Sequence, residues 1–293
     1  MKKLISLIIF IAICLLLICS KRISQITTDV ITNFYIRVLP LLAPTILLNY
    51  IFIYSGGVNN IIYDLKLNNV TKHKINKYAL IALGLISGTP SLASMLNEEL
   101  NKNLSKQEVQ NILNCFTIPS LPFLIALINN CSWNIITKIL IILIPLLVQF
   151  IIFFIDDYKI KNDEIKPIVQ NNENIISKAI ISTARTIILM SGAIILFSLI
   201  SYPFDLFLKG NVLMLIKGLF EFSYPLSYLF STYSIENLFF IIAIISFSSV
   251  SLLVQVKLIV PKISLKAIIK KRLIIATSSI LLTTIMIFFL NIQ

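Results

Sequence analysis

The chain has 293 residues, of which 57% are hydrophobic and only 13% are charged. Soluble domains carry about 25% charged residues, so this composition excludes a soluble globular enzyme and a disordered chain and leaves a polytopic helical membrane protein. The net charge of +12 is explained by Lys and Arg in the cytoplasmic loops of such a protein. We therefore predict no nucleic-acid partner.

The first predicted element is a transmembrane helix over 4–20. Met1, Lys2 and Lys3 precede this apolar run as in a secretory signal sequence, but no small-x-small cleavage site follows it. We predict an uncleaved helix, which together with a short outer loop makes up residues 1–33. Cleavage would remove this one span and leave the other predictions unchanged.

Eight further apolar segments follow, each of about the 20 residues that a helix needs to cross a bilayer. Their runs are apolar on every face and lack the alternation of outer-membrane strands, and backbone groups in lipid must be bonded within their own segment. The predicted fold is therefore all-α, a polytopic transmembrane helical bundle with broken helices or re-entrant hairpins. The segments are 34–55, 78–96, 110–130, 135–155, 179–201, 211–232, 236–256 and 273–291.

The positive-inside rule orients these segments. The most basic connections are 64–77 and 257–272. Placing both in the cytoplasm puts the N-terminus inside, the C-terminus outside and the 156–178 loop outside. The pair 78–96 and 110–130 returns the chain to its starting side, whether it crosses fully or forms a re-entrant hairpin.

Proline at membrane depth is the most informative feature of these segments. Proline lacks the N–H that would bond the carbonyl four residues earlier, and bare carbonyls in lipid are costly. Such breaks therefore persist inside protein or beside water, as in the substrate and ion sites of secondary transporters. Single prolines also kink ordinary helices, and this is our interpretation of Pro145. The prolines at depth are Pro40, Pro44, Pro90, Pro119, Pro122, Pro145 and Pro225.

Three clusters of small and polar residues interrupt the apolar segments. The first cluster surrounds Gly88 and the second surrounds Thr117. Between these two clusters, Ser105 and Glu108 have capping-box spacing, so a new helix is predicted to begin near Lys106. This order of breaks and capped helix is typical of a hairpin that dips into a membrane, but small-residue clusters also serve plain helix packing, and both interpretations stay open. The candidate site residues are Gly88, Pro90 and Ser91, then Asn114, Thr117, Pro119 and Pro122, and finally Ser248, Ser249, Ser251 and Gln255.

Glu221 is the sharpest single candidate. It lies about 15 Å along 211–232 and so near the midplane, where an ionised acid costs on the order of 2.5–3.5 kcal/mol. Pro225 frees the carbonyl of Glu221, and a carboxylate beside a free carbonyl would form a cation or proton site. The alternatives are a salt bridge with Lys217 or a shifted span that leaves Glu221 near the interface. Arg185 is either a counter-charge or a side chain that snorkels outward.

Metal and nucleophilic chemistry find little support. The single histidine, His73, lies in a basic loop, and the acid pairs 98–99 and 156–157 are interpreted as solvated faces. The cysteines have no CxxC spacing, and we interpret them as small buried hydrophobes. We predict no metal, no cofactor and no enzymatic activity. The cysteines are Cys14, Cys19, Cys115 and Cys131.

The same residues carry a resemblance to a known family. Gly88-Thr89-Pro90-Ser91-Leu92-Ala93 is similar to the glycine-aromatic-proline-x-glycine-alanine motif of the nucleoside-recognition (Gate) domain membrane proteins. Leu219-Phe220-Glu221 resembles their leucine-glutamate element, and 247–255 resembles their phenylalanine-glycine-glycine-x-serine-x-x-x-glutamine segment. The similarity covers 34–260, and within the family the chain resembles the sporulation integral membrane proteins of the YlbJ type.

The resemblance implies a multi-pass protein of the sporulating cell's membrane that is needed for spore cortex formation, with a Gate domain similar to that of concentrative nucleoside transporters. It divides the chain into 1–33, the Gate-like membrane domain 34–260, and 261–293, a basic cytoplasmic loop with the C-terminal helix. The leading hypothesis is a transporter-like protein of the cell membrane that moves or senses a small solute. The alternative is a non-transporting scaffold of a sporulation complex. The expected partners are the lipid bilayer and the solute, with a coupling cation or proton and a homo-oligomer left open.

Overall fold

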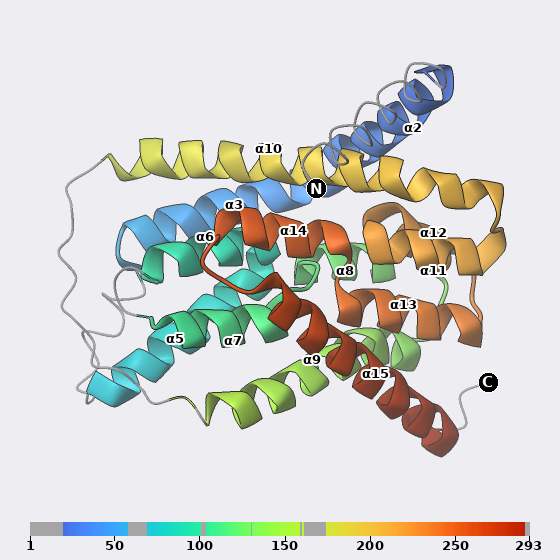
Figure 1. Cartoon of the computed structure of the whole chain (residues 1–293). Helices are drawn as coiled ribbons and strands as arrows, with labels where there is room; N and C mark the ends of the chain where they lie inside the picture. Colours follow the sequence, from blue (N-terminus) through green and yellow to red (C-terminus); the bar gives the residue numbers. More distant parts are fainter. Residues whose placement is uncertain are drawn as a thin grey trace, which may run out of the picture.

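The structure is a computed structural model, and it describes residues 20–57, 69–100, 104–129, 131–158, 160 and 174–290. Within these ranges the secondary structure consists of helices without a strand (Figure 1), so the predicted all-α bundle is confirmed. The predicted first helix lies outside the described residues, apart from Ser20.

The described chain begins with a bent pair of helices. Helix α2 (Ser20–Asn33) continues through the π-helical turn η1 (Phe34–Val38) into α3 (Leu39–Tyr54). The two helical axes meet at 53°, and Pro40 lies in the first turn of α3, where the missing N–H is not needed. Both α2 and α3 pack against α10 (Ile175–Ser201).

The first helical hairpin consists of α5 (Asn69–Ser87) and α6 (Thr89–Glu99), and the chain turns back between them at Gly88. The two helices approach closely because Gly84 has no side chain: a Cβ there would lie 2.7 Å from the Cβ of Leu92. The predicted loop over 64–77 is therefore wrong from Asn69 onwards, since the polar residues before the apolar run already belong to α5.

An interrupted helix follows the hairpin. The predicted capping box starts α7 (Lys106–Phe116): Ser105 Oγ accepts from the Glu108 N–H at 3.3 Å, and Glu108 Oε2 accepts from the Ser105 N–H at 3.0 Å. After a four-residue break, α8 (Leu121–Asn129) continues the segment. Together α7 and α8 are long and apolar enough to cross a membrane. The long helix α9 (Ile135–Asp157) then returns the chain.

The second half of the chain repeats this order of elements. After α10 and the 3-10 turn η2 (Tyr202–Leu206), α11 (Gly210–Phe220) and α12 (Ser223–Ser231) form a second hairpin. An interrupted helix, α13 (Ile235–Phe247) and α14 (Val250–Ile259), and a long helix, α15 (Leu265–Leu290), follow it. The expected single span over 211–232 is thus wrong, because the chain folds back between α11 and α12. The expected loop over 257–272 is too long, because only the residues between the end of α14 and the start of α15 form a loop.

The two halves have opposite orientations (Figure 1). The hairpin α5–α6 opens at one end of the bundle and α11–α12 at the other, and α9 and α15 likewise end at opposite ends. This is the arrangement of an inverted repeat, in which each half has a helix, a hairpin, an interrupted helix and a long helix.

The predicted side of the 156–178 loop is wrong. Asp157 at the end of α9 contacts Lys77 of α5, and Asp156 contacts Lys271 near the start of α15, both at 2.6 Å. Both ends of this loop therefore lie at the same end of the bundle as the basic segments (Figure 1). The prediction failed because the expected segment 78–96 covers parts of both α5 and α6, which return as a hairpin on their own, so that α7–α8 is a further crossing and not the return of 78–96.

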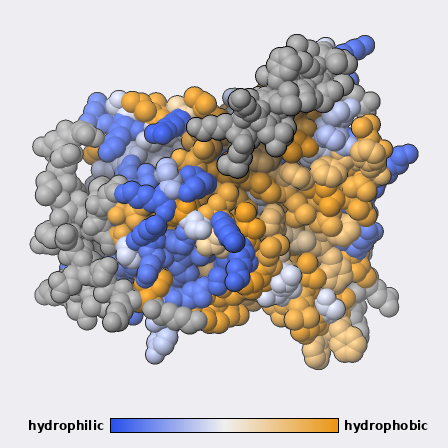
Figure 2. Space-filling view, viewed as in Figure 1, coloured by the Kyte–Doolittle hydropathy of each residue, from blue (hydrophilic) through white to orange (hydrophobic). Residues whose placement is uncertain are grey.

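The apolar surface indicates a multi-pass membrane protein. Five described segments are long and apolar enough to cross a membrane, and the bent pair α2–α3 is a sixth candidate. Large apolar side chains are exposed along them, among them Ile139, Ile188 and Leu281 at 53–69%. Figure 2 shows hydrophobic residues covering most of one end of this face and hydrophilic residues gathered towards the other. The five segments are 106–129, 135–157, 175–206, 235–259 and 265–289.

Candidate functional site

The breaks of the two hairpins and of α7–α8 meet around one small cavity. It lies between two apolar cores, with Phe123 from one and Ile118 from the other in its wall. The void has room for about one or two water molecules. Its lining residues are Phe34, Val38, Leu42, Gly88, Thr89, Pro90, Ile118, Pro119, Ser120, Phe123, Met190, Ile194, Phe222, Ser223, Leu252 and Gln255.

The tip of the first hairpin forms one wall of this cavity. Gly88 has φ 89° and ψ 166°, a conformation that is essentially restricted to glycine. Pro90 lies in the first turn of α6, so the proline starts a new helix and does not kink a continuous one. Next to it, the Thr89 hydroxyl donates to the carbonyl of Ile118 at 2.6 Å and so joins the hairpin tip to the break between α7 and α8.

We expect Gly88→Ala to lower the free energy of unfolding by about 1–3 kcal/mol, because alanine is strained at this φ and its Cβ would lie 3.4 Å from the Cβ of Ser120. The matched control is Gly192→Ala in the middle of α10, where a Cβ meets nothing within 4 Å. This control should stabilise the protein by about 0.5–1 kcal/mol. Thermal unfolding of both purified variants checks the difference, and equal effects would contradict the strain at Gly88.

The break between α7 and α8 has its freed carbonyls bonded. The carbonyl of Cys115, which Pro119 leaves without a helical donor, accepts from Arg272 at 2.7 Å, and that of Ile118, freed by Pro122, accepts from Thr89. Pro122 itself lies in the first turn of α8. The predicted costly groups are thus paired within the protein, as required of a break at membrane depth.

Glu221 lies in the break of the second hairpin, with 3% of its side chain exposed. Its Oε1 accepts from the Ser223 hydroxyl at 2.6 Å and from the Ser223 N–H at 3.0 Å. The carboxylate therefore caps the start of α12, where the helix dipole favours negative charge. Pro225 lies in the first turn of α12. Since Ser223 lines the cavity, Glu221 reaches the void through one hydroxyl.

Neither of the two cations considered as partners of Glu221 pairs with it in the structure. Lys217 pairs with Asp205 at 2.5 Å, so the alternative of a salt bridge between Lys217 and Glu221 is wrong. Arg185 is exposed on α10. Within the described part of the chain no cation pairs with Glu221, which leaves a buried carboxylate held by a hydroxyl and a helix start.

The third cluster forms the break between α13 and α14. Ser248 and Ser249 have φ of 76° and 48°, a left-handed conformation that favours glycine. Ser249 and Ser251 bond each other at 3.0 Å, so their hydroxyls face one another. Further along α14, Gln255 lines the cavity, and its Oε1 is buried without a partner among the described residues. This oxygen is an acceptor that a ligand or water in the void would satisfy.

The cavity brings together four of the predicted site residues, Gly88, Pro90, Pro119 and Gln255. The others lie off its lining. Ser91 is buried in α6, Asn114 accepts from Gln110 at 2.7 Å, and the Thr117 hydroxyl donates to the carbonyl of Leu113. The remaining predicted residues outside the lining are Pro122, Glu221, Ser248, Ser249 and Ser251.

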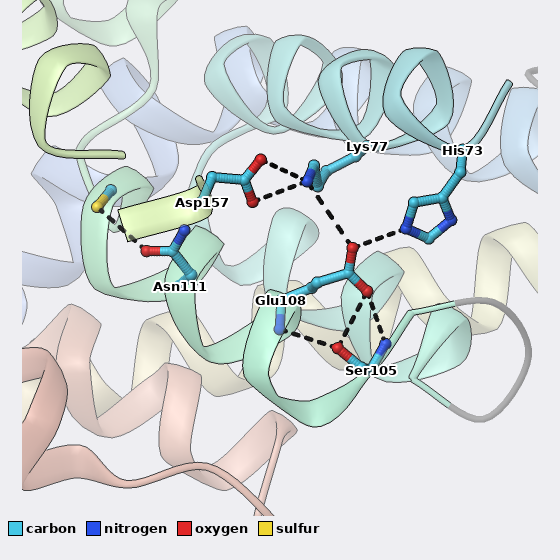
Figure 3. Close-up of polar contacts among 7 residues, drawn as sticks. His73, Lys77, Ser105, Glu108, Asn111 and Asp157 are labelled. Carbon is cyan, nitrogen blue, oxygen red and sulfur yellow. Dashed lines mark hydrogen bonds and ion pairs between the residues drawn. The ribbon is translucent and has the colours of Figure 1, made fainter. Parts of the chain in front are cut away.

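A buried ionic cluster lies away from this cavity, on α5, α7 and α9 (Figure 3). Glu108 Oε1 lies 2.6 Å from His73 Nε2 and 3.8 Å from Lys77 Nζ, and Lys77 pairs with Asp157 at 2.6 Å. His73, Lys77 and Glu108 are at most 1% exposed. Placing His73 in a basic loop and Asp157 on a solvated face was therefore wrong. The i, i+4 spacing of His73 and Lys77, continuing the apolar helix face backwards, was the signal available.

The acid pair 98–99 and the two described cysteines are partly or fully buried. Glu98 accepts from the Tyr54 hydroxyl at 2.7 Å and Glu99 is buried, so the solvated interpretation of 98–99 is also wrong. Cys115 and Cys131 are buried free thiols, as predicted. Cys14 and Cys19 lie outside the described residues. In the described ranges, no three His, Cys, Asp or Glu side chains are grouped as a metal site.

Comparison with known proteins gives no relative: no family model matches the chain, and neither a curated protein nor a solved structure matches it.

Proposed function

We propose that this multi-pass membrane protein is transporter-like and moves or senses a small solute at the cavity between its helix breaks. The observation that carries the proposal is the convergence of two hairpin tips and an interrupted helix on one void, near the buried carboxylate of Glu221. Secondary transporters place substrate and ion sites at such breaks, between two inverted repeats.

The polar groups at the void suit a small ligand with hydrogen-bond donors. Gln255 Oε1 is an acceptor without a partner among the described residues, and Ser223 links the void to Glu221. A buried carboxylate held by a hydroxyl can exchange a proton or neutralise a cation. This supports proton or cation coupling, with Glu221 as the charged group.

We place the protein in the cell membrane of a sporulating cell, in spore cortex formation, on the resemblance to the Gate-domain proteins of the YlbJ type. The resemblance includes Gly88 and Pro90, which line the cavity, and Glu221, which bonds the lining residue Ser223. If Glu221→Gln and Pro90→Ala strains formed heat-resistant spores with normal cortex, this part of the proposal would fail.

A scaffold of a sporulation complex is the second candidate. The void is small and its lining is mostly apolar, and Ser249 and Ser251 bond each other, as in a packing seam. Crosslinked partners without any solute binding would support this candidate.

We expect purified protein to bind a small solute in a thermal-shift screen that includes nucleosides and peptidoglycan precursors, and Glu221→Gln to weaken that binding about tenfold. Glu221 is the charged group proposed to pair with the coupled proton or cation, and the loss of one charge-assisted contact of about 1.5–3 kcal/mol corresponds to a weakening of about tenfold or more. Uptake of the same solute into proteoliposomes then separates movement from sensing. The control is Glu236→Gln, an exposed acid at the start of α13. Equal binding by both variants would remove Glu221 from the site.

A further inference from the structure

A buried guanidinium joins the two interrupted helices at their breaks. Arg272 belongs to α15, and its side chain is fully buried. Its Nη1 donates to the carbonyl of Cys115 at 2.7 Å. Its Nη2 donates to the Ser248 hydroxyl at 2.6 Å and to the carbonyl of Ile245 at 3.2 Å, while Nε donates to the carbonyl of Phe247 at 3.4 Å.

All four acceptors are neutral oxygens, and three of them are main-chain carbonyls from the last turns of α7 and α13. Helix C-termini carry the negative end of the helix dipole, and their last carbonyls have no partner within the helix. In the part of the chain that the structure describes, no carboxylate pairs with Arg272. The positive charge is therefore balanced by two helix ends and a hydroxyl.

We propose that these four oxygens form a monovalent-cation site and that the guanidinium of Arg272 is its resident cation. Secondary transporters use unwound carbonyls and half-helix C-termini to hold a diffusible ion. Here the chain supplies the cation itself, so the two interrupted helices stay joined at their breaks without a bound ion. The inference concerns this crossing of helices alone and does not depend on the proposed movement of a solute.

The planar guanidinium fits this site better than an ammonium would. Its five N–H donors fan out in a fixed plane and reach acceptors on two helices at once, and it is weakly hydrated, so its burial costs less. Removing the side chain takes their Arg272 donor from the carbonyls of Cys115 and Phe247 and leaves them facing a hole of about the volume of the lost group, and unpaired buried carbonyls are costly. A free guanidinium ion would fill that hole and restore the bonds.

The test measures the thermal midpoint, Tm, of the full-length Arg272→Ala protein in detergent. We expect Tm to fall by roughly 10 °C, because buried oxygens lose their donor and the lost side chain leaves a cavity. Guanidinium chloride at millimolar concentration, far below denaturing levels, should restore at least half of that loss. Urea, which has a similar shape without the charge, and sodium chloride of equal concentration should not. Equal restoration by urea would overturn the proposal.

The neighbouring Lys271 provides the matched control. It pairs with Asp156 at 2.6 Å at a partly exposed position, so guanidinium should leave the Tm of Lys271→Ala unchanged. Adding Ser248→Ala to Arg272→Ala removes one acceptor, and the guanidinium concentration for half restoration should rise about tenfold. An unchanged concentration would contradict the assigned oxygens.

If the alanine variant does not fold, Arg272→Lys and Arg272→Met test whether the site needs a cation. Both replacements are long side chains, but lysine alone keeps a positive charge. We expect Arg272→Lys to retain more of the native Tm than Arg272→Met. A methionine variant as stable as the natural protein would show that the crossing needs apolar packing and no cation.

Discussion

Replacing Glu108 by alanine should lower the free energy of unfolding by about 3–5 kcal/mol, the cost of removing one partner from a buried ionic cluster. Glu108 accepts from the Ser105 N–H and lies 2.6 Å from His73 Nε2. Without it, His73 keeps no bonded ring nitrogen among the described residues, since its Nδ1 has no partner there. Titration of the purified protein with SDS, followed by loss of helicity, measures the change.

Two further variants separate the contributions within this cluster. Glu108→Gln keeps a side chain suited to the capping box and removes the charge, so its effect should lie between those of Glu108→Ala and the natural protein. Glu236→Ala removes an exposed acid from the first turn of α13 and should change stability by about 0.5 kcal/mol or less. If Glu108→Ala were no more destabilising than Glu236→Ala, the cluster would contribute nothing to the fold.

Local signals in the sequence predict some of the helix starts and breaks. The spacing of Ser105 and Glu108 predicts the start of α7 because both partners of the capping box lie within one turn. Gly88 and Pro90 predict a break from an equally local signal, because glycine and proline each determine which backbone conformations are available at their own position. The direction of the chain after the break depends on packing, such as that of Gly84 on Leu92, and neither proline nor glycine encodes it.

The partners of the buried charges could not be predicted, because they are remote in the sequence. Glu108 lies 35 residues from His73, Asp157 lies 80 residues from Lys77 and Cys115 lies 157 residues from Arg272. Each charge taken alone resembles part of a basic or acidic loop. The 156–178 loop was placed wrongly because each apolar segment was counted as one crossing. Such a count cannot recognise a hairpin that returns to its own side.

The two hairpins predict an all-or-none labelling pattern for single cysteines in a background without the native four. Lys74 and Lys106 are exposed residues of α5 and α7 at the open end of the first hairpin. Cysteines at both should react with an impermeant maleimide from one side of the membrane, the cytoplasmic side by the positive-inside rule. Cysteines at Lys209 and Glu236, which flank the second hairpin, should react from the opposite side only.

This pattern distinguishes folding back from crossing, because a single continuous span over α5 and α6 would place Lys74 and Lys106 on opposite sides. Ser177→Cys, exposed in the first turn of α10, is the internal control and should label with Lys106, since both lie at the basic end of the bundle. If the cysteines that replace Lys74 and Lys106 reacted from opposite sides, α5 and α6 would not form a hairpin. The inverted repeat would then fail, because its symmetry requires each hairpin to return to the side from which it enters.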